Sequence, residues 1–241
     1  DDFLPDSKEG KRTDGRDLLL ELQKRGYEIV HTRNGLLDIP AWHAPRIFGA
    51  FRSGDLDFAD VAGGKESEPS LSDLVRQAIQ LLQYNRKGYL LVVDAGLISK
   101  AAHANEGERV LREVAELDRA VGTAIDYAGD KALIIVTGKE SIGGLHMNGY
   151  PFKNDRGVSV VGMNPQNIPS LTWSTGPSAN QAQDRSSPDQ PPKPSEPVAV
   201  AQPSAIGVAE DVIAVSRGPG SEKLQGFKDN TDVFTVMSKN L

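Results

Sequence analysis

The chain has 241 residues, of which 38% are hydrophobic and 25% are charged, with a formal net charge of −6 and no cysteine. This length and composition are typical of a folded globular protein with a sizeable core. The acidic balance gives no electrostatic reason to expect nucleic acid or an anionic membrane as a partner. The lack of cysteine excludes disulfides and thiolate metal sites, and no apolar run approaches the roughly 18 residues of a membrane span.

The first 140 residues predict helices and strands in alternation. Apolar residues spaced by three and four mark the helices, and continuous apolar runs mark the strands. In chain order, the predicted elements are a helix over Arg16–Arg25 capped by Asp14, strands over Tyr27–Val30 and Ile47–Phe51, a helix from Ser70 or Ser72 to about Asn85, a strand over Tyr89–Val93, a helix over Glu106–Ala128 and a strand over Ala132–Val136. This alternation indicates an α/β fold, mainly a parallel sheet with helices on both faces.

The rest of the chain differs in composition. Residues 176–204 are rich in Pro, Ser, Gln and Asp. Such a segment buries too little apolar surface to fold alone, so we predict an exposed, PPII-like loop. Strands are expected over Val158–Met163 and Asp211–Ser216, and a short helix over Thr231–Ser238. Because the last strand needs a sheet to join, residues 1–241 are predicted to form a single domain that contains the Pro-rich loop.

The framework of a metal site follows the predicted strand Tyr89–Val93. The strand runs into Asp94, and His103 comes nine positions later. Carboxylates and histidines are common metal ligands, and this arrangement at a strand end is typical of α/β hydrolases. Ser99 occupies the position between them where a second carboxylate is expected, and the next strand ends in Gly138-Lys139-Glu140. The pattern indicates a metal-hydrolase scaffold from which ligands have been removed.

The same residues also have interpretations without a metal. His103 would be a polar residue at the N-terminus of the long helix, and Asp94 would accept hydrogen bonds from nearby loop amides. Glu140 would form a salt bridge with the adjacent Lys139. A nucleophilic Ser99 with His103 as its base would lack a third group to orient the histidine.

Several segments in the same order carry a family resemblance. They are Gly10–Leu18 with Lys24–Tyr27, Ile47–Phe51, Pro69–Leu74, Asn85–Tyr89 and Ala209–Pro219. On these motifs the chain resembles the C-terminal half of alkaline phosphatases over nearly its whole length. The resemblance implies a three-layer α/β/α fold of which this chain holds a partial sheet.

For the segment after Tyr89–Val93, the resemblance implies that part of a metal site persists. Active members have a glutamate for magnesium at the position of Asp94, and an aspartate and a histidine for the first zinc at the positions of Ser99 and His103. Asp94 and His103 are therefore predicted as residual metal ligands, whereas a serine replaces the aspartate.

The other ligand positions have changed. An Asp-His pair for the second zinc aligns with Lys139 and Glu140, and another zinc histidine aligns with Gly207. The ammonium of Lys139 opposes a dication by direct repulsion. Glu140 would be a substitute ligand, because carboxylates bind zinc and magnesium, although its neighbour Lys139 favours a salt bridge instead. No catalytic residue is predicted, since no segment matches the family's serine nucleophile.

Three functions fit these residues. The first, which we adopt as the prediction, is a non-catalytic alkaline-phosphatase-like protein, a structural or binding subunit with no expected cofactor. Its partner would be another protein chain or an upstream segment that covers the open sheet edge. The second is a metal-dependent phosphomonoesterase with a rebuilt site, in which Asp94, His103 and Glu140 surround one zinc or magnesium ion. The third is a fragment of a larger phosphatase relative. The resemblance also implies a periplasmic, secreted or cell-surface location.

Overall fold

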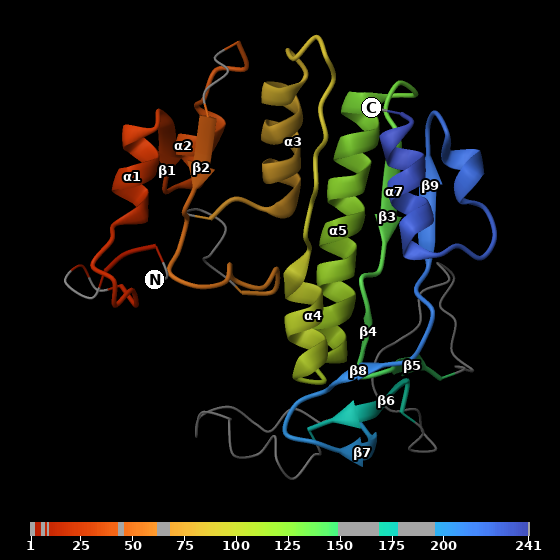
Figure 1. Cartoon of the computed structure of the whole chain (residues 1–241). Coiled ribbons are helices and arrows are strands. Elements are labelled where there is room, and N and C mark those ends of the chain that lie inside the picture. Colours follow the sequence, from red (N-terminus) through yellow and green to blue (C-terminus); the bar gives the residue numbers. More distant parts are fainter. Residues whose placement is uncertain are drawn as a thin grey trace. The chain divides into compact units, whose positions relative to one another are not determined.

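The computed structural model describes residues 3–5, 8, 10–42, 46–61, 68–148, 169–177 and 196–240. The chain divides into two compact units, whose elements are labelled in Figure 1. Unit 1 contains Asp1–Asp94, Glu116–Ile134 and Gly218–Leu241, and unit 2 contains Ala95–Ala115 and Ile135–Arg217. That residues 1–241 form a single domain stays a prediction.

Unit 1 begins with helices and strands in alternation. Its elements up to residue 94 are α1 (Leu18–Lys24), β1 (Tyr27–Val30), α2 (Arg33–Leu37), β2 (Arg46–Gly49) and α3 (Leu71–Leu82), and its C-terminal part holds the 3₁₀ helix η3 (Ser221–Leu224) and α7 (Asn230–Ser238). β1 and β2 pair in parallel, from Tyr27 opposite Arg46 to Val30 opposite Gly49. The predicted strand over Tyr27–Val30 and the predicted C-terminal helix are confirmed.

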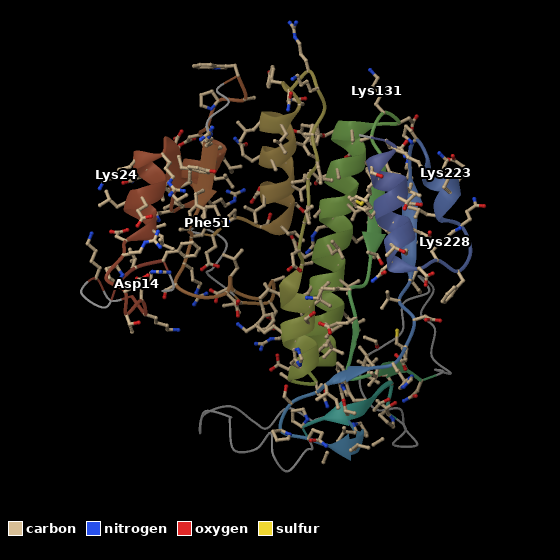
Figure 2. The ribbon with its side chains drawn as sticks, viewed as in Figure 1. Asp14, Lys24, Phe51, Lys131, Lys223 and Lys228 are labelled. Carbon is tan, nitrogen blue, oxygen red and sulfur yellow. The ribbon has the colours of Figure 1, made fainter. Side chains whose placement is uncertain are left out.

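The cap of α1 lies one turn later than predicted. Asp17, not Asp14, accepts a hydrogen bond from the backbone N–H of Leu20 at 2.9 Å. The carboxylate of Asp14 instead accepts from the Arg12 guanidinium at 3.0 Å. Gly15 follows with a φ of 68°, so the chain is left-handed there and cannot begin a helix. Figure 2 shows Asp14 in the loop that precedes α1.

A capping box starts α3, and a hydrophobic cluster forms along it. The Asp73 N–H donates to Ser70 Oγ at 3.1 Å, and the Ser70 N–H donates to the Asp73 carboxylate at 3.2 Å. Of the two serines considered from the sequence, Ser70 is therefore the cap. The cluster contains Val75, Ile79 and Ala120, with Leu71, Tyr89, Leu91 and Ala124 packed against it.

The segment Tyr89–Asp94 is extended beside α3 but pairs with no strand among the described residues, so the predicted strand over Tyr89–Val93 is wrong (Figure 1). Its alternation is nonetheless that of a strand. Tyr89 and Leu91 pack on the α3 cluster, whereas the alternate residues Leu90 and Val92 are 53% and 77% exposed. A ladder needs a neighbouring strand to supply its hydrogen bonds, and the described part of the chain supplies none here.

Unit 2 contains two helices and several short strands. Its elements are α4 (Gly96–His103), the first part of α5 (Gly107–Ala128), β3 (Ile134–Thr137), β4 (Ser141–Ile142), β5 (Leu145–Met147), β6 (Leu171–Gly176), β7 (Val198–Ala201), β8 (Gly207–Val208) and β9 (Ala214–Arg217). The long helix is confirmed within one residue. β3 and β9 begin two and three residues later than predicted.

The predicted layering, a mainly parallel sheet with helices on both faces, is not confirmed. The described strands form separate sheets, β1–β2, β3–β9, β4–β8 and β5–β6–β7. β6 and β7 are parallel, but β4 pairs with β8 and β5 with β6 in antiparallel fashion. Gly143 and Gly144, with φ values of 72° and 56°, form the tight turn between β4 and β5. These two strands belong to different sheets, so the turn directs the chain from one sheet into the other.

The predicted Pro-rich loop is partly wrong. Residues 198–201 form β7, because Val-Ala-Val-Ala is an apolar run that pairs with β6. Residues 178–195 and the predicted strand Val158–Met163 lie outside the described residues. In the described part of the chain, no helix is both long and apolar enough to cross a membrane.

Candidate functional site

His103 is the last residue of α4, so its predicted place at the N-terminus of the long helix is wrong. Asn105, at a φ of 53°, separates α4 from α5. The Nδ1 of His103 lies 2.7 Å from the carbonyl oxygen of Ala205. A carbonyl only accepts, so Nδ1 carries the proton and the neutral ring has its lone pair on Nε2. This is the tautomer and the type of support that histidine ligands of metals usually have.

Glu140 and Gly207 lie close together across the β4–β8 ladder. Gly207 pairs with Ile142, two residues after Glu140. A Cβ placed on Gly207 would lie 3.8 Å from Glu140 Oε2 and would meet no atom closer than that. The position where the resemblance predicts a zinc histidine thus has room for a Cβ. It lies two residues after Ala205, the partner of His103.

A pocket of about 130 Å³ brings Ser99 and Glu140 together. The two residues come from α4 and from the turn before β4, and the remaining walls are apolar. Those walls are formed by Ile98, Ala102, Val110, Ile142, Leu145 and Trp173. Within the described residues, the Ser99 hydroxyl has no histidine as hydrogen-bond partner, so the pairing with His103 that a nucleophile would need is not present.

The expected salt bridge between Lys139 and Glu140 is present. Lys139 Nζ lies 3.9 Å from Glu140 Oε1, and the two side chains are 79% and 48% exposed. Ion pairs at such exposure contribute little to stability. The pair nevertheless places a fixed positive charge beside the one carboxylate of the pocket.

Asp94 belongs to unit 1. It ends the first stretch of unit 1, and its side chain is exposed. The other candidate positions belong to unit 2. The predicted hydrogen bonds from loop amides to Asp94 are not among those made by the described residues.

The donor set in unit 2 does not fit zinc. A zinc site needs three or four nitrogen, oxygen or sulfur ligands in tetrahedral geometry. At the ligand positions that the resemblance predicts in unit 2, the chain has His103, a serine, a glutamate paired with a lysine, and a glycine. No three His, Asp or Glu side chains of the described residues are placed to hold a metal ion. Asp94, His103 and Glu140 as metal ligands stay a prediction.

Sequence reasoning missed one partly buried acidic residue, Glu196. Its carboxylate accepts hydrogen bonds from the indole N–H of Trp173 and from the backbone N–H of Gly107, the latter at 3.2 Å. Burial, with the nearby carboxylates of Glu108 and Glu106, raises the pKa of Glu196 despite these donors. Glu196 stands among prolines in the sequence, and composition alone marked that stretch as solvated.

Comparisons with known proteins give one family. A family model described as alkaline phosphatase matches residues 2–241. The membrane-bound alkaline phosphatase of Bombyx mori is 31% identical over 207 residues, which are 78% of this chain and 37% of that protein. The tissue-nonspecific isozyme of alkaline phosphatase from Homo sapiens is 30% identical over 162 residues, which are 65% of this chain and 30% of that protein. The chain thus spans about a third of the length of these curated relatives.

Solved structures agree with this match. The alkaline phosphatase of Thermus thermophilus is 27% identical, with a TM-score of 0.52 over 57% of this chain and 29% of that chain. The alkaline phosphatase of the Antarctic bacterium TAB5 covers 95% of this chain with a TM-score of 0.61, over 56% of its own length. At 22% identity, the latter supports the α/β fold alone.

Proposed function

The chain belongs to the alkaline phosphatase family, and on that premise we propose that it is a non-catalytic member that serves as a structural or binding subunit. One observation carries the proposal. Ser99 and Gly207, where the resemblance predicts zinc ligands, both lie near Glu140 in unit 2, yet they offer only a hydroxyl and a hydrogen atom. The scaffold is retained where the ligands are not.

The chemistry explains why these replacements matter together. Metal-assisted phosphoryl transfer uses bound cations to stabilise the attacking and leaving oxygens. His103 alone among the aligned zinc positions keeps a nitrogen ligand, and the ammonium of Lys139 adds a repulsive charge. One replacement would alter the affinity for a metal, but several at one site remove the coordination shell.

A metal-dependent phosphomonoesterase is the alternative. It is favoured by the orientation of His103, whose Nδ1–H is bonded to Ala205 and whose Nε2 is left with a lone pair. In that case Asp94, His103 and Glu140 would provide the ligands of a zinc or magnesium ion. If the chain is an enzyme, hydrolysis of phosphomonoesters is the expected activity, because the relatives are named as alkaline phosphatases.

The partner of a non-catalytic subunit would be a protein chain, or an upstream segment, that covers apolar surface. In unit 1, Leu90 and Val92 of the extended segment are exposed. In unit 2, Ile213 is 81% exposed and Val215 on β9 is 58% exposed. Exposed apolar strands are normally covered or paired in proteins. A location outside the cytoplasm accords with a relative named as membrane-bound.

Metal content and turnover, measured on the purified chain, test the proposal. After incubation with zinc and magnesium and removal of excess, we expect no stoichiometric metal and no hydrolysis of p-nitrophenyl phosphate. Stoichiometric metal together with hydrolysis that His103→Ala abolishes would establish the alternative. The matched control is His146→Ala, an exposed histidine of β5 whose ring contacts Ser174 rather than the aligned positions.

A further inference from the structure

We propose that the pocket in unit 2 binds a small primary alkylammonium ion. This inference rests on the proposed non-catalytic function. The pocket combines one carboxylate, one hydroxyl and six apolar side chains. Ser99 and Glu140 stand where the resemblance predicts zinc ligands, and the rest of the lining is hydrocarbon.

The lining favours a ligand with an apolar body. Ile98, Val110, Ile142 and Leu145 present branched aliphatic groups. The indole N–H of Trp173 is already donated to Glu196, so this ring offers carbon surface to the pocket. Removal of apolar ligand surface from water by such walls is favourable.

The polar groups select the charge of the ligand. Glu140 supplies a carboxylate, and Ser99 supplies a hydroxyl that can accept a hydrogen bond. A second carboxylate stands nearby, because Glu210 accepts a hydrogen bond from Ser141 Oγ at 2.8 Å, next to Glu140. Lys139 repels a dication here, but it balances only one of the two carboxylates, so two negative charges and one positive charge leave a net charge of −1 for a monovalent cation. A cation is therefore favoured, and a phosphate would face two carboxylates.

The volume limits the size of the ligand. The pocket has a volume of about 130 Å³, which is enough for a few water molecules. Pockets for drug-sized ligands are larger, about 300 to 1,000 Å³. Butylammonium, with five non-hydrogen atoms, fits this volume, and 1-butanol is its neutral counterpart of the same shape.

Fluorescence of Trp173 measures the binding, because this residue lines the pocket. The chain has two tryptophans, and Trp42→Phe removes the other one, which is 76% exposed. In that background we expect saturable binding of butylammonium at roughly millimolar concentrations, in keeping with the small number of ligand atoms. Butanol should bind about fivefold more weakly, and inorganic phosphate should not compete.

Three variants place the charge selectivity at Glu140. Glu140→Gln should weaken butylammonium binding about fivefold, the upper range for a half-exposed ion pair, and leave butanol binding unchanged. The control Glu210→Gln alters a carboxylate outside the lining and should change the affinity less than twofold. Ser99→Leu should fill the pocket and prevent binding of both probes.

The proposal is overturned if butylammonium does not saturate, if butanol binds equally well, or if Glu140→Gln has no effect. Bound zinc and phosphomonoester hydrolysis are measured on the same preparation. Their appearance would defeat the proposed non-catalytic function, whereas failure of the ammonium titration alone would defeat only this inference.

Discussion

His103 and Ala205 are joined by two hydrogen bonds. The ring Nδ1 donates to the Ala205 carbonyl at 2.7 Å, and the Ala205 N–H donates to the His103 carbonyl at 2.9 Å. These two bonds connect the C-terminus of α4 to the residues just before β8. Gly207 is the first residue of β8. His103 thus has a structural role that requires no metal.

His103→Ala should therefore destabilise the chain without any metal present. Loss of the ring leaves the half-buried contact to Ala205 unmade, and a hydrogen bond of this kind contributes about 1 kcal/mol. Denaturant unfolding in the presence of a chelator measures the difference. The control Lys139→Ala removes an exposed side chain of the same unit and should change the free energy of unfolding by less than about 0.5 kcal/mol. Equal stability of the wild type and His103→Ala would contradict the structural role.

Glu196 should make the stability of the chain rise on acidification. The pKa of Glu196 is raised in the folded state above the ordinary value of 4.5. The folded state thus binds the proton more readily than the unfolded state, so this contribution is fully present below pH 4.5 and is lost as the pH rises through the folded pKa. Glu196→Gln keeps an oxygen that accepts from Trp173 and Gly107 but does not titrate.

Unfolding of the wild type and of Glu196→Gln at pH 5 and pH 7 tests this sign. We expect the variant to gain stability relative to the wild type at pH 7, and the gain to shrink at pH 5. Glu222→Gln, at an exposed position, is the control for the loss of a carboxylate. A gain that grows toward pH 5 would refute a raised pKa.

Gly107→Ala should destabilise the chain, although alanine is the better helix former. A Cβ on Gly107 would collide with the Glu196 carboxylate and with the side chain of Leu171. Overpacking of this kind costs about 1 to 3 kcal/mol. Gly122→Ala in the same helix is the matched control, because its Cβ meets no atom within 4 Å. That change should stabilise the chain by about 1 kcal/mol, and thermal unfolding compares the two.

Ser70→Ala and Ser72→Ala should differ, although the sequence left both serines open as the cap of α3. Ser70 Oγ accepts from the Asp73 N–H, whereas Ser72 Oγ is buried with no hydrogen-bond partner. Loss of the cap costs about 1 kcal/mol. Removal of an unsatisfied hydroxyl is expected to be neutral or slightly stabilising. Helix content and denaturant midpoints of the two variants measure this, and equal losses would contradict the capping box.

Local patterns predicted helices well and strand pairing poorly. The 3.6-residue periodicity of the long helix placed α5 within one residue, since side chains within one helix determine that pattern. The segment Tyr89–Val93 has the alternation of a strand, but its partners depend on distant parts of the chain. The β4–β8 ladder joins residues more than 60 positions apart, which no local pattern specifies.

The sequence predicted which residues belong to the candidate site, but it did not predict which contacts they make. The family resemblance identified Ser99, Glu140 and Gly207, and unit 2 brings these positions together. The bond from His103 to Ala205 spans 102 positions, and the bond from Glu196 to Trp173 spans 23. Neither has a sequence signal, because a backbone carbonyl and an indole N–H belong to no metal or catalytic motif.

Zinc titration of a variant with restored ligands tests the central claim most directly. Ser99→Asp combined with Gly207→His would join the existing His103, and the space around Gly207 allows the added side chain. By calorimetry, we predict one bound zinc ion for this double variant and none for the wild type or for Ser99→Ala with Gly207→Ala. A wild-type chain that binds one zinc ion as tightly as the restored variant would contradict the claim that the site has lost its metal.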